Sequence, residues 1–161
     1  MGTIKATNIE PIADNGTVTL GSSGDTFTLG SGVVQSNLNY PAFEAYNSGN
    51  QSLSDASATK LEFDTEVFDS NGTFSSNRFT PGVAGKYFIY SQIPLDSEGT
   101  GSDYIILQLY KNGSRVFANR FYEGSLDLDE PSISINIVLD LAVSDYIEIY
   151  GAMGVGSGNP T

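Results

Sequence analysis

The chain has 161 residues, 39% of them hydrophobic, which is enough for one ordinary domain plus a short appendage. Lys and Arg total 7 against 19 Asp and Glu, so the formal net charge is −12. This field repels phosphate backbones and anionic membrane surfaces, and we expect neither nucleic-acid binding nor membrane insertion.

The residue types that most catalytic and metal sites need are missing. There is no histidine and no cysteine, so the commonest general base, the thiol nucleophile and the usual zinc ligands are absent. The 19 acidic residues leave a two-carboxylate glycosidase formally open, but no pair stands out, and we expect a protein that is not an enzyme. The lack of disulfides favours stabilisation by oligomerisation. The N-terminus has no signal-peptide pattern, which fits a virion component released by lysis.

A short repeat marks the beginning of the chain. Thr17–Ser22 and Thr26–Ser31 each read as a four-residue alternating strand closed by Gly-Ser. Such units cannot bury their apolar side alone, but three chains wound together could supply neighbours, as in viral fibre shafts. A flexible leader or a plain hairpin is the alternative. We place the boundary after Leu38, with residues 1–38 as a β-rich attachment, anchor or stalk segment and residues 39–161 as a head.

Strand patterns follow one another through the rest of the chain. Residues 61–67 alternate between apolar or threonine and acidic side chains, which predicts a half-buried strand. Residues 87–92 are apolar or aromatic on both faces, so we expect this strand to be covered on both sides. Further strands are predicted at residues 105–110, 116–122, 133–139 and 146–150.

Turn signals separate these strands. Asp69–Gly72 reads as a turn, and the Asn112-Gly113 pair is the strongest short signal for a hairpin. About eight short strands with turn-rich connections are typical of an all-β sandwich or jelly roll.

Several segments together resemble the C1q-like globular head, a branch of the jelly rolls related to tumour necrosis factor. Their order and spacing agree over roughly residues 41–152; the segments are Pro41–Tyr46, Thr59–Asp69, Arg78–Tyr87, Leu109–Gly113 and Leu141–Glu148. The resemblance implies an antiparallel two-sheet jelly roll, a homotrimer, a binding surface on the head and a fibrous stalk.

The sequence departs from this family at three places. Ser144 stands where the family usually has a turn glycine, and Ile89 where it usually has phenylalanine. The family ends in an apolar strand beside the first strand, whereas Gly154–Thr161 cannot form that strand. Either this chain is cut short before the last family strand, or another segment fills its place, because an unfilled gap would expose edge backbone.

The leader has no Gly-X-Y run and is not collagen. Its Thr-Leu-Gly-Ser repeats resemble N-terminal segments of bacteriophage fibre and appendage proteins. We expect a phage virion structural protein, attached to other virion proteins through residues 1–38, whose head binds a glycan or protein on the host surface. The alternatives are a capsid fibre, decoration or cement protein with a purely structural role, and a secreted bacterial adhesin.

Two groups of residues are candidates for contacts. Polar loops between strong strands commonly carry recognition, and we expect binding at Asp96, Glu98, Asp103, Asp127, Asp129 and Glu130. The first three are also the candidate ligands for Ca²⁺, although they lack ordered ligand spacing and a solvated connection is favoured. No other cofactor is expected. The aromatic residues expected to be shared between core and trimer interface, with sugar stacking as the alternative, are Phe43, Tyr87, Phe88, Tyr90, Tyr110 and Phe117.

Overall fold

The computed structural model of the chain describes residues 41–94, 102–122 and 132–155, together with a few residues before residue 32. The chain divides into two units, Met1–Leu38 and Asn39–Thr161. Every regular element of the described residues is a strand; the strands are β1 (Phe43–Tyr46), β2 (Thr59–Lys60), β3 (Thr65–Asp69), β4 (Phe74–Ser75), β5 (Arg78–Phe79), β6 (Gly85–Pro94), β7 (Ser102–Lys111), β8 (Ser114–Tyr122), β9 (Ser132–Leu141) and β10 (Ile147–Val155). Accordingly, these ranges contain no helix that could cross a membrane.

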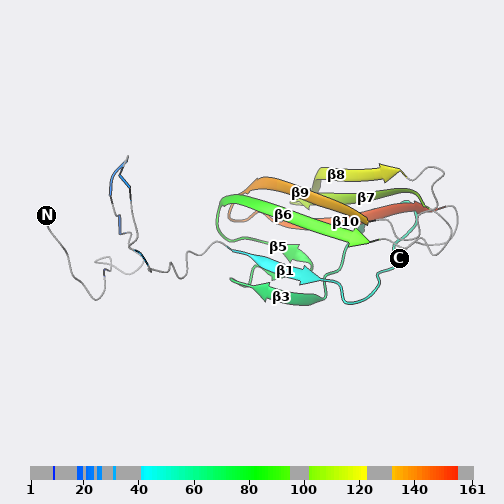
Figure 1. Cartoon of the computed structure of the whole chain (residues 1–161), viewed down its shortest axis with the longest axis horizontal. Helices are drawn as coiled ribbons and strands as arrows, with labels where there is room; N and C mark the ends of the chain where they lie inside the picture. The colour runs from blue at the N-terminus through cyan, green and yellow to red at the C-terminus, as the bar shows by residue number, and fades with distance from the viewer. Residues whose placement is uncertain are drawn as a thin grey trace. The chain divides into compact units, whose positions relative to one another are not determined.

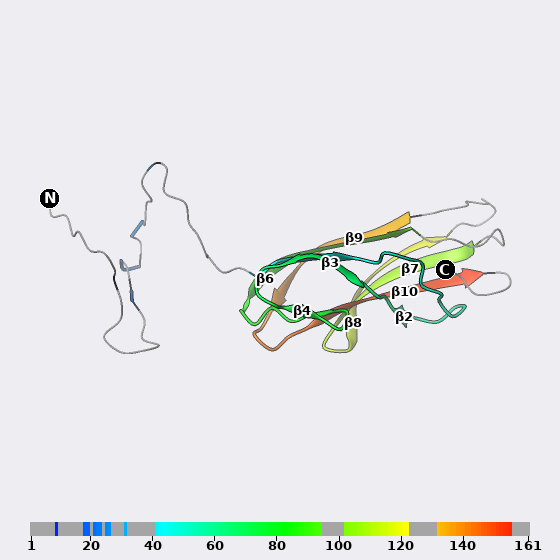
Figure 2. The same ribbon diagram turned by 90° about the horizontal axis from the view of Figure 1, so that it is seen from below.

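The second unit is a sandwich of two antiparallel layers (Figures 1 and 2). One layer is a six-stranded sheet in the order β4-β5-β10-β7-β8, with β2 also paired to β10. The other layer consists of two separate pairs, β6 with β9 and β1 with β3. The all-β, antiparallel fold predicted from the strand patterns is confirmed. β1 and β6 face each other in the second layer without pairing.

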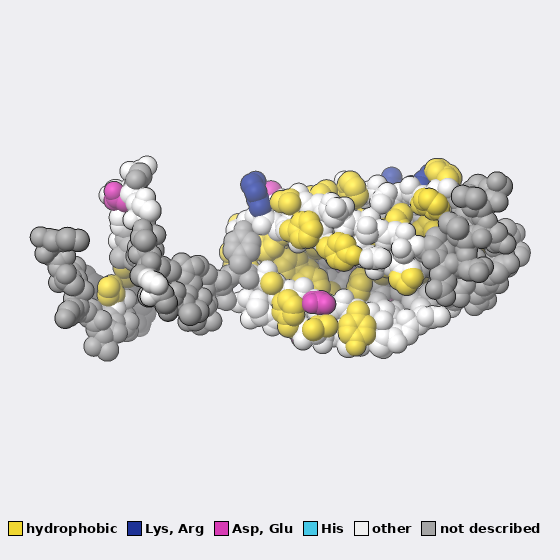
Figure 3. Space-filling view, viewed as in Figure 1, with side chains coloured by type: hydrophobic (Ala, Val, Ile, Leu, Met, Phe, Trp, Pro, Cys, Tyr) yellow, Lys and Arg dark blue, Asp and Glu magenta, His cyan; other side chains and the backbone are white. Residues whose placement is uncertain are grey.

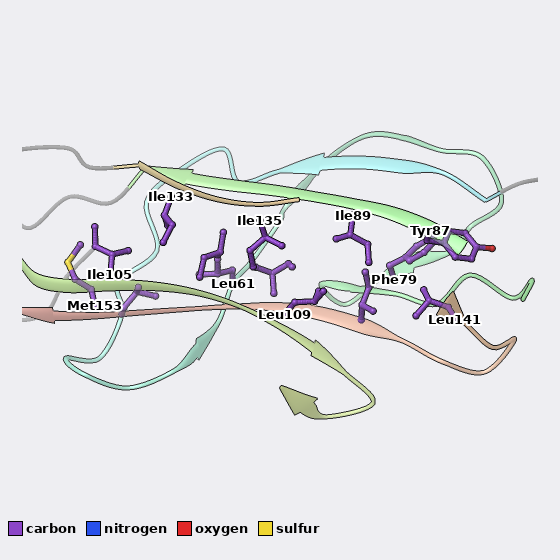
Figure 4. Packing of buried hydrophobic residues seen from close by; sticks show 14 of the residues in the cluster. Leu61, Phe79, Tyr87, Ile89, Ile105, Leu109, Ile133, Ile135, Leu141 and Met153 are labelled. Atoms are coloured by element: carbon purple, nitrogen blue, oxygen red, sulfur yellow. The ribbon is translucent and has the colours of Figure 1, made fainter. Parts of the chain in front are cut away.

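The core lies between the layers, and alternation along the strands supplies it. Ile105, Leu107 and Leu109 of β7 are fully buried, as is Met153 of β10. Ile89 of β6 and its neighbours on β9 meet them from the opposite layer (Figure 4). Strands with apolar side chains at every second position bury one face each, and burial of apolar surface is the main term that stabilises such a sandwich.

The segment before β6 closes one end of the core. Phe79 is buried and contacts the ring of Tyr87 edge to face, with ring centroids 5.6 Å apart. Pro81 is fully buried, and Gly82 follows with a φ of 69°, a conformation that glycine adopts without strain. The Tyr87 hydroxyl donates to the carbonyl of Val83 at 2.7 Å.

The predicted Asn-Gly hairpin is confirmed between β7 and β8. Asn112 and Gly113 have φ values of 52° and 76°, as a two-residue hairpin turn with positive φ at both positions requires. The Asn112 side chain also donates to the Asp145 carboxylate at 2.7 Å and accepts from the Tyr146 amide at 3.0 Å. The hairpin is therefore fastened to the turn that precedes β10.

Three local expectations need correction. The alternation predicted for residues 61–67 fails at Val67, which is exposed, because a bulge opposite β1 leaves Val67 between the paired residues Glu66 and Phe68. Residues 61–64 also lie between β2 and β3 rather than in a strand. The last strand is longer than predicted, since Gly154 and Val155 belong to β10 and pair with β7.

The first unit is described at only a few positions. The Ser22 amide donates to the Asp25 carboxylate at 2.7 Å, and the Asp25 amide donates to the Ser22 carbonyl at 3.0 Å. Together they form a tight turn directly before residue 26, between the two copies of the repeat. The predicted strands of the repeat lie mostly outside the described residues.

Candidate functional site

Strand β6 divides its side chains between the core and the outer surface. Tyr87 and Ile89 are buried, whereas Phe88 and Tyr90 point outward and are 69% and 60% exposed. The sequence prediction that both faces of this strand are covered is therefore not met by the described residues of one chain. Large aromatic side chains left in water gain free energy when a second surface covers them.

Other exposed apolar side chains surround these two rings. Val138 of β9 lies directly across from Phe88 in the strand register, and Tyr46 of β1 and Phe68 of β3 are exposed as well. Figure 3 shows apolar side chains gathered on the face of the molecule that carries β9, β6, β1 and β3. We refer to Tyr46, Phe68, Phe88, Tyr90 and Val138 as the outer face. An exposed apolar patch of this kind is a candidate contact surface.

A groove of about 1180 Å³ opens in this face between β1 and β6. Its walls are the two strands themselves, and its apolar lining includes Phe43, Leu53, Leu61, Phe63 and Ile89. Except for the partly buried rings of Phe43 and Phe63, these side chains are buried core residues. The groove therefore reaches from the surface down to the core.

The opposite edge of the sandwich exposes a second set of apolar residues. Phe117 and Phe121 of β8 stand directly across from Leu109 and Ile105, so they point toward the core side of the sheet. Both are nevertheless exposed, as is every residue of β8. Among the described strands, the facing layer ends at β9, where Asn119 donates to the Ser134 carbonyl at 2.9 Å. This open edge is a second candidate contact surface.

A charged cluster lies on the outside of the six-stranded sheet. Glu148 is only 5% exposed, and its Oε1 accepts from Lys60 at 2.8 Å and from Arg78 at 2.9 Å. Burial raises the pKa of Glu148, but hydrogen bonds from both cations outweigh burial, so the pKa lies below its ordinary value. The Arg78 guanidinium also stacks on the Tyr146 ring, 3.8 Å from its centroid. Every charge in this cluster already has a partner, which is the pattern of a structural ion pair.

The predicted aromatic residues fall in separate places. Phe43 stacks on Phe74 and Phe79, and Tyr87 belongs to the core cluster. Phe88 and Tyr90 lie on the outer face, and Phe117 lies on the β8 edge. The Tyr110 ring contacts the Tyr150 ring at a tilt of 37°, with 4.2 Å between ring centroids. The structure thus distributes them over the core, the outer face, the open edge and the six-stranded sheet.

The predicted acidic binding residues remain predictions. Asp96, Glu98, Asp127, Asp129 and Glu130 lie outside the described residues. Asp103 is part of β7, but its side chain is not among those described. Within the described ranges, acidic side chains do not gather into a group of three or more that could hold a metal ion.

The described residues define an antiparallel, two-layer jelly-roll sandwich, and comparison with known proteins supports this class. No family model matches the chain, and no curated protein matches it. Among solved structures, the chain is similar to the globular domain of zebrafish complement 1qA protein, with a TM-score of 0.53 and 22% sequence identity over 74% of this chain and 84% of that domain. The chain therefore has the C1q-like jelly-roll fold that its sequence segments predicted.

Proposed function

We propose that the chain is a non-enzymatic, homotrimeric head of a phage fibre or other virion appendage, and that the assembled head binds a glycan or protein on the host surface. The observation that carries the proposal is the outer face, where Phe88 and Tyr90 stand in water beside Val138. A monomer gains nothing from such a face, whereas an assembly buries it.

Two different exposed surfaces favour a ring over a simple pair. The outer face lies on one layer, and the open β8 edge, with Phe117 and Phe121, lies at the side of the other. When the edge of one copy packs on the outer face of the next, the contact is heterologous, and a threefold rotation closes it.

A matched pair of variants tests the assembly. Phe88→Glu places a charge in the proposed contact, and we expect it to convert the trimer to monomer at micromolar concentration. Val143→Glu is the control, because Val143 is exposed to a similar degree but lies in the turn between β9 and β10. A trimer that persists in Phe88→Glu, with unchanged circular dichroism, would remove the outer face from the contact.

A competition experiment tests the binding role. Three identical heads raise the effective concentration at a surface, so weak individual sites still hold together. Purified protein added to susceptible cells should therefore reduce adsorption of the parent phage, and it should bind these cells directly. Unchanged adsorption at saturating protein, with no cell binding, would leave a decoration or cement role on the particle. The same protein should bind particles that lack it in that case.

A further inference from the structure

The groove between β1 and β6 has the form of a missing strand position. Among the described residues β1 pairs only with β3, and β6 pairs only with β9. The edges of β1 and β6 that face each other therefore carry backbone groups without ladder partners. The arrows of β1 and β6 point in the same direction (Figure 1), so one strand running the opposite way in the groove would be antiparallel to both.

The floor of the groove carries both apolar side chains and a polar hydroxyl, so its occupant needs both apolar and polar groups. Phe43, Leu61 and Ile89 line it with apolar surface. Ser91 of β6 also lines it and is 8% exposed, and its hydroxyl has no hydrogen-bond partner within the described ranges. A buried hydroxyl left without a partner costs free energy, so the occupant has to bring polar groups as well as apolar ones.

A polypeptide strand satisfies both requirements. A small apolar molecule or a lipid chain would cover the floor but would leave the backbone N–H and C=O groups of both rims dry and unpaired. An added strand pairs with both rims, places alternate side chains on the floor and turns the others to the surface.

We propose that residues 26–29 of a second copy insert into this groove as an antiparallel strand. Thr26-Phe27-Thr28-Leu29 is uncharged and alternates, so Phe27 and Leu29 would meet the floor while the threonines face outward. Four residues match the length of β1. The turn formed by Ser22 and Asp25 directly precedes the segment.

The link to the second copy follows from chain length and from the proposed trimer, on which this inference rests. Residues 30–41 connect the segment to the start of the head, and twelve extended residues span up to roughly 40 Å. Exchange of this strand would tie the copies together without a disulfide, in a chain that has no cysteine.

Because the chain has no cysteine, introduced cysteine pairs report the contact directly. One full-length chain carries Thr28→Cys, or Thr26→Cys to test the alternative register. A second full-length chain carries Glu44→Cys on the outward side of β1. The two chains carry different tags and are co-expressed. Adjacent strands hold outward side chains close enough for a disulfide after modest adjustment. We expect a mixed disulfide at least tenfold more abundant than with Val143→Cys as the partner.

A second measurement covers the case in which the cysteines fail to react. Phe27→Asp should speed hydrogen exchange at backbone amides of β1 and β6 at least tenfold and leave β7 and β10 unchanged. If the mass is trimeric, no mixed disulfide forms in either register and hydrogen exchange is unchanged, the proposed strand insertion is overturned but the trimer is not. A disulfide within single chains that carry both cysteines, without mixed product, shows insertion into the same copy and also overturns it. A monomeric mass overturns the proposed assembly itself.

Discussion

Replacing Glu148 with glutamine isolates the charged cluster on the six-stranded sheet. Glutamine keeps the shape and one acceptor oxygen, but it removes the charge that Lys60 and Arg78 share at 2.8 and 2.9 Å. The two cations then lie next to each other without a counter-ion. The variant therefore measures the electrostatic contribution of the cluster with little change in packing.

The size of the effect follows from exposure. Removing one member of a fully buried ion pair costs about 3–5 kcal/mol, because the remaining charge is stranded in the interior. Here the side chains of Lys60 and Arg78 are 30% and 43% exposed, so water solvates part of the remaining charge. We therefore expect a loss of about 2 kcal/mol, below the fully buried range. For a chain of this size that lowers Tm by roughly 4–8 °C.

Urea unfolding at pH 7, at one protein concentration for all variants, measures this loss. Glu62→Gln is the control, because Glu62 is an exposed carboxylate on the connection from β2 to β3. The difference in free energy of unfolding between wild type and Glu148→Gln should fall as the pH drops below 4.5. The reason is that the pKa of Glu148 is lowered in the fold, so its contribution to stability is lost on protonation. A difference between Glu148→Gln and wild type below about 0.5 kcal/mol at pH 7 would refute the reasoning.

Further variants test other parts of the account. Leu109→Ala removes a fully buried side chain of β7 and should cost about 2–5 kcal/mol in urea unfolding, while a value under 1 kcal/mol would show that the site collapses or is not core. Gly113→Ala, at a φ of 76°, should cost about 1 kcal/mol by the same assay, and a stabilised variant would contradict the turn assignment. Hydrogen bonds from Lys111 and Asn112 lower the pKa of Asp145 from 3.8 to about 2, so its contribution is present above pH 3.8 and lost as the pH falls toward 2. Asp145→Asn should therefore flatten the stability curve between these values, and an unchanged curve would contradict the contact.

The sequence predicts local features of the fold well, since each depends on neighbouring residues. The alternation of Ile105, Leu107 and Leu109 marks the buried face of β7, and Asn112-Gly113 marks the hairpin that follows. The exposed position of Val67 is different, because the bulge there depends on how β3 registers with β1. One shifted residue reverses the side on which the next side chains lie.

The candidate surfaces depend on distant pairing and are harder to predict. The sequence indicates that β6 is apolar on both faces, but only the fold shows that Phe88 and Tyr90 are the pair left outside. In the charged cluster, Glu148 contacts Arg78, which lies 70 positions earlier in the sequence, and Lys60, which lies 88 positions earlier. No local sequence pattern connects these residues. The one sequence signal is an acidic residue between Ile147 and Ile149, where a two-sided apolar strand would carry another apolar side chain.

The mass of the native protein in solution tests the central claim most directly. Sedimentation equilibrium or light scattering of the full chain distinguishes a monomer of 17.1 kDa from a trimer of three times that mass. The protein concentration runs from about 1 to 50 micromolar, a range that covers ordinary assembly affinities. We predict the threefold mass throughout, with the Phe88→Glu variant at the monomer mass. A wild-type chain that remains at 17.1 kDa across the range would contradict the account.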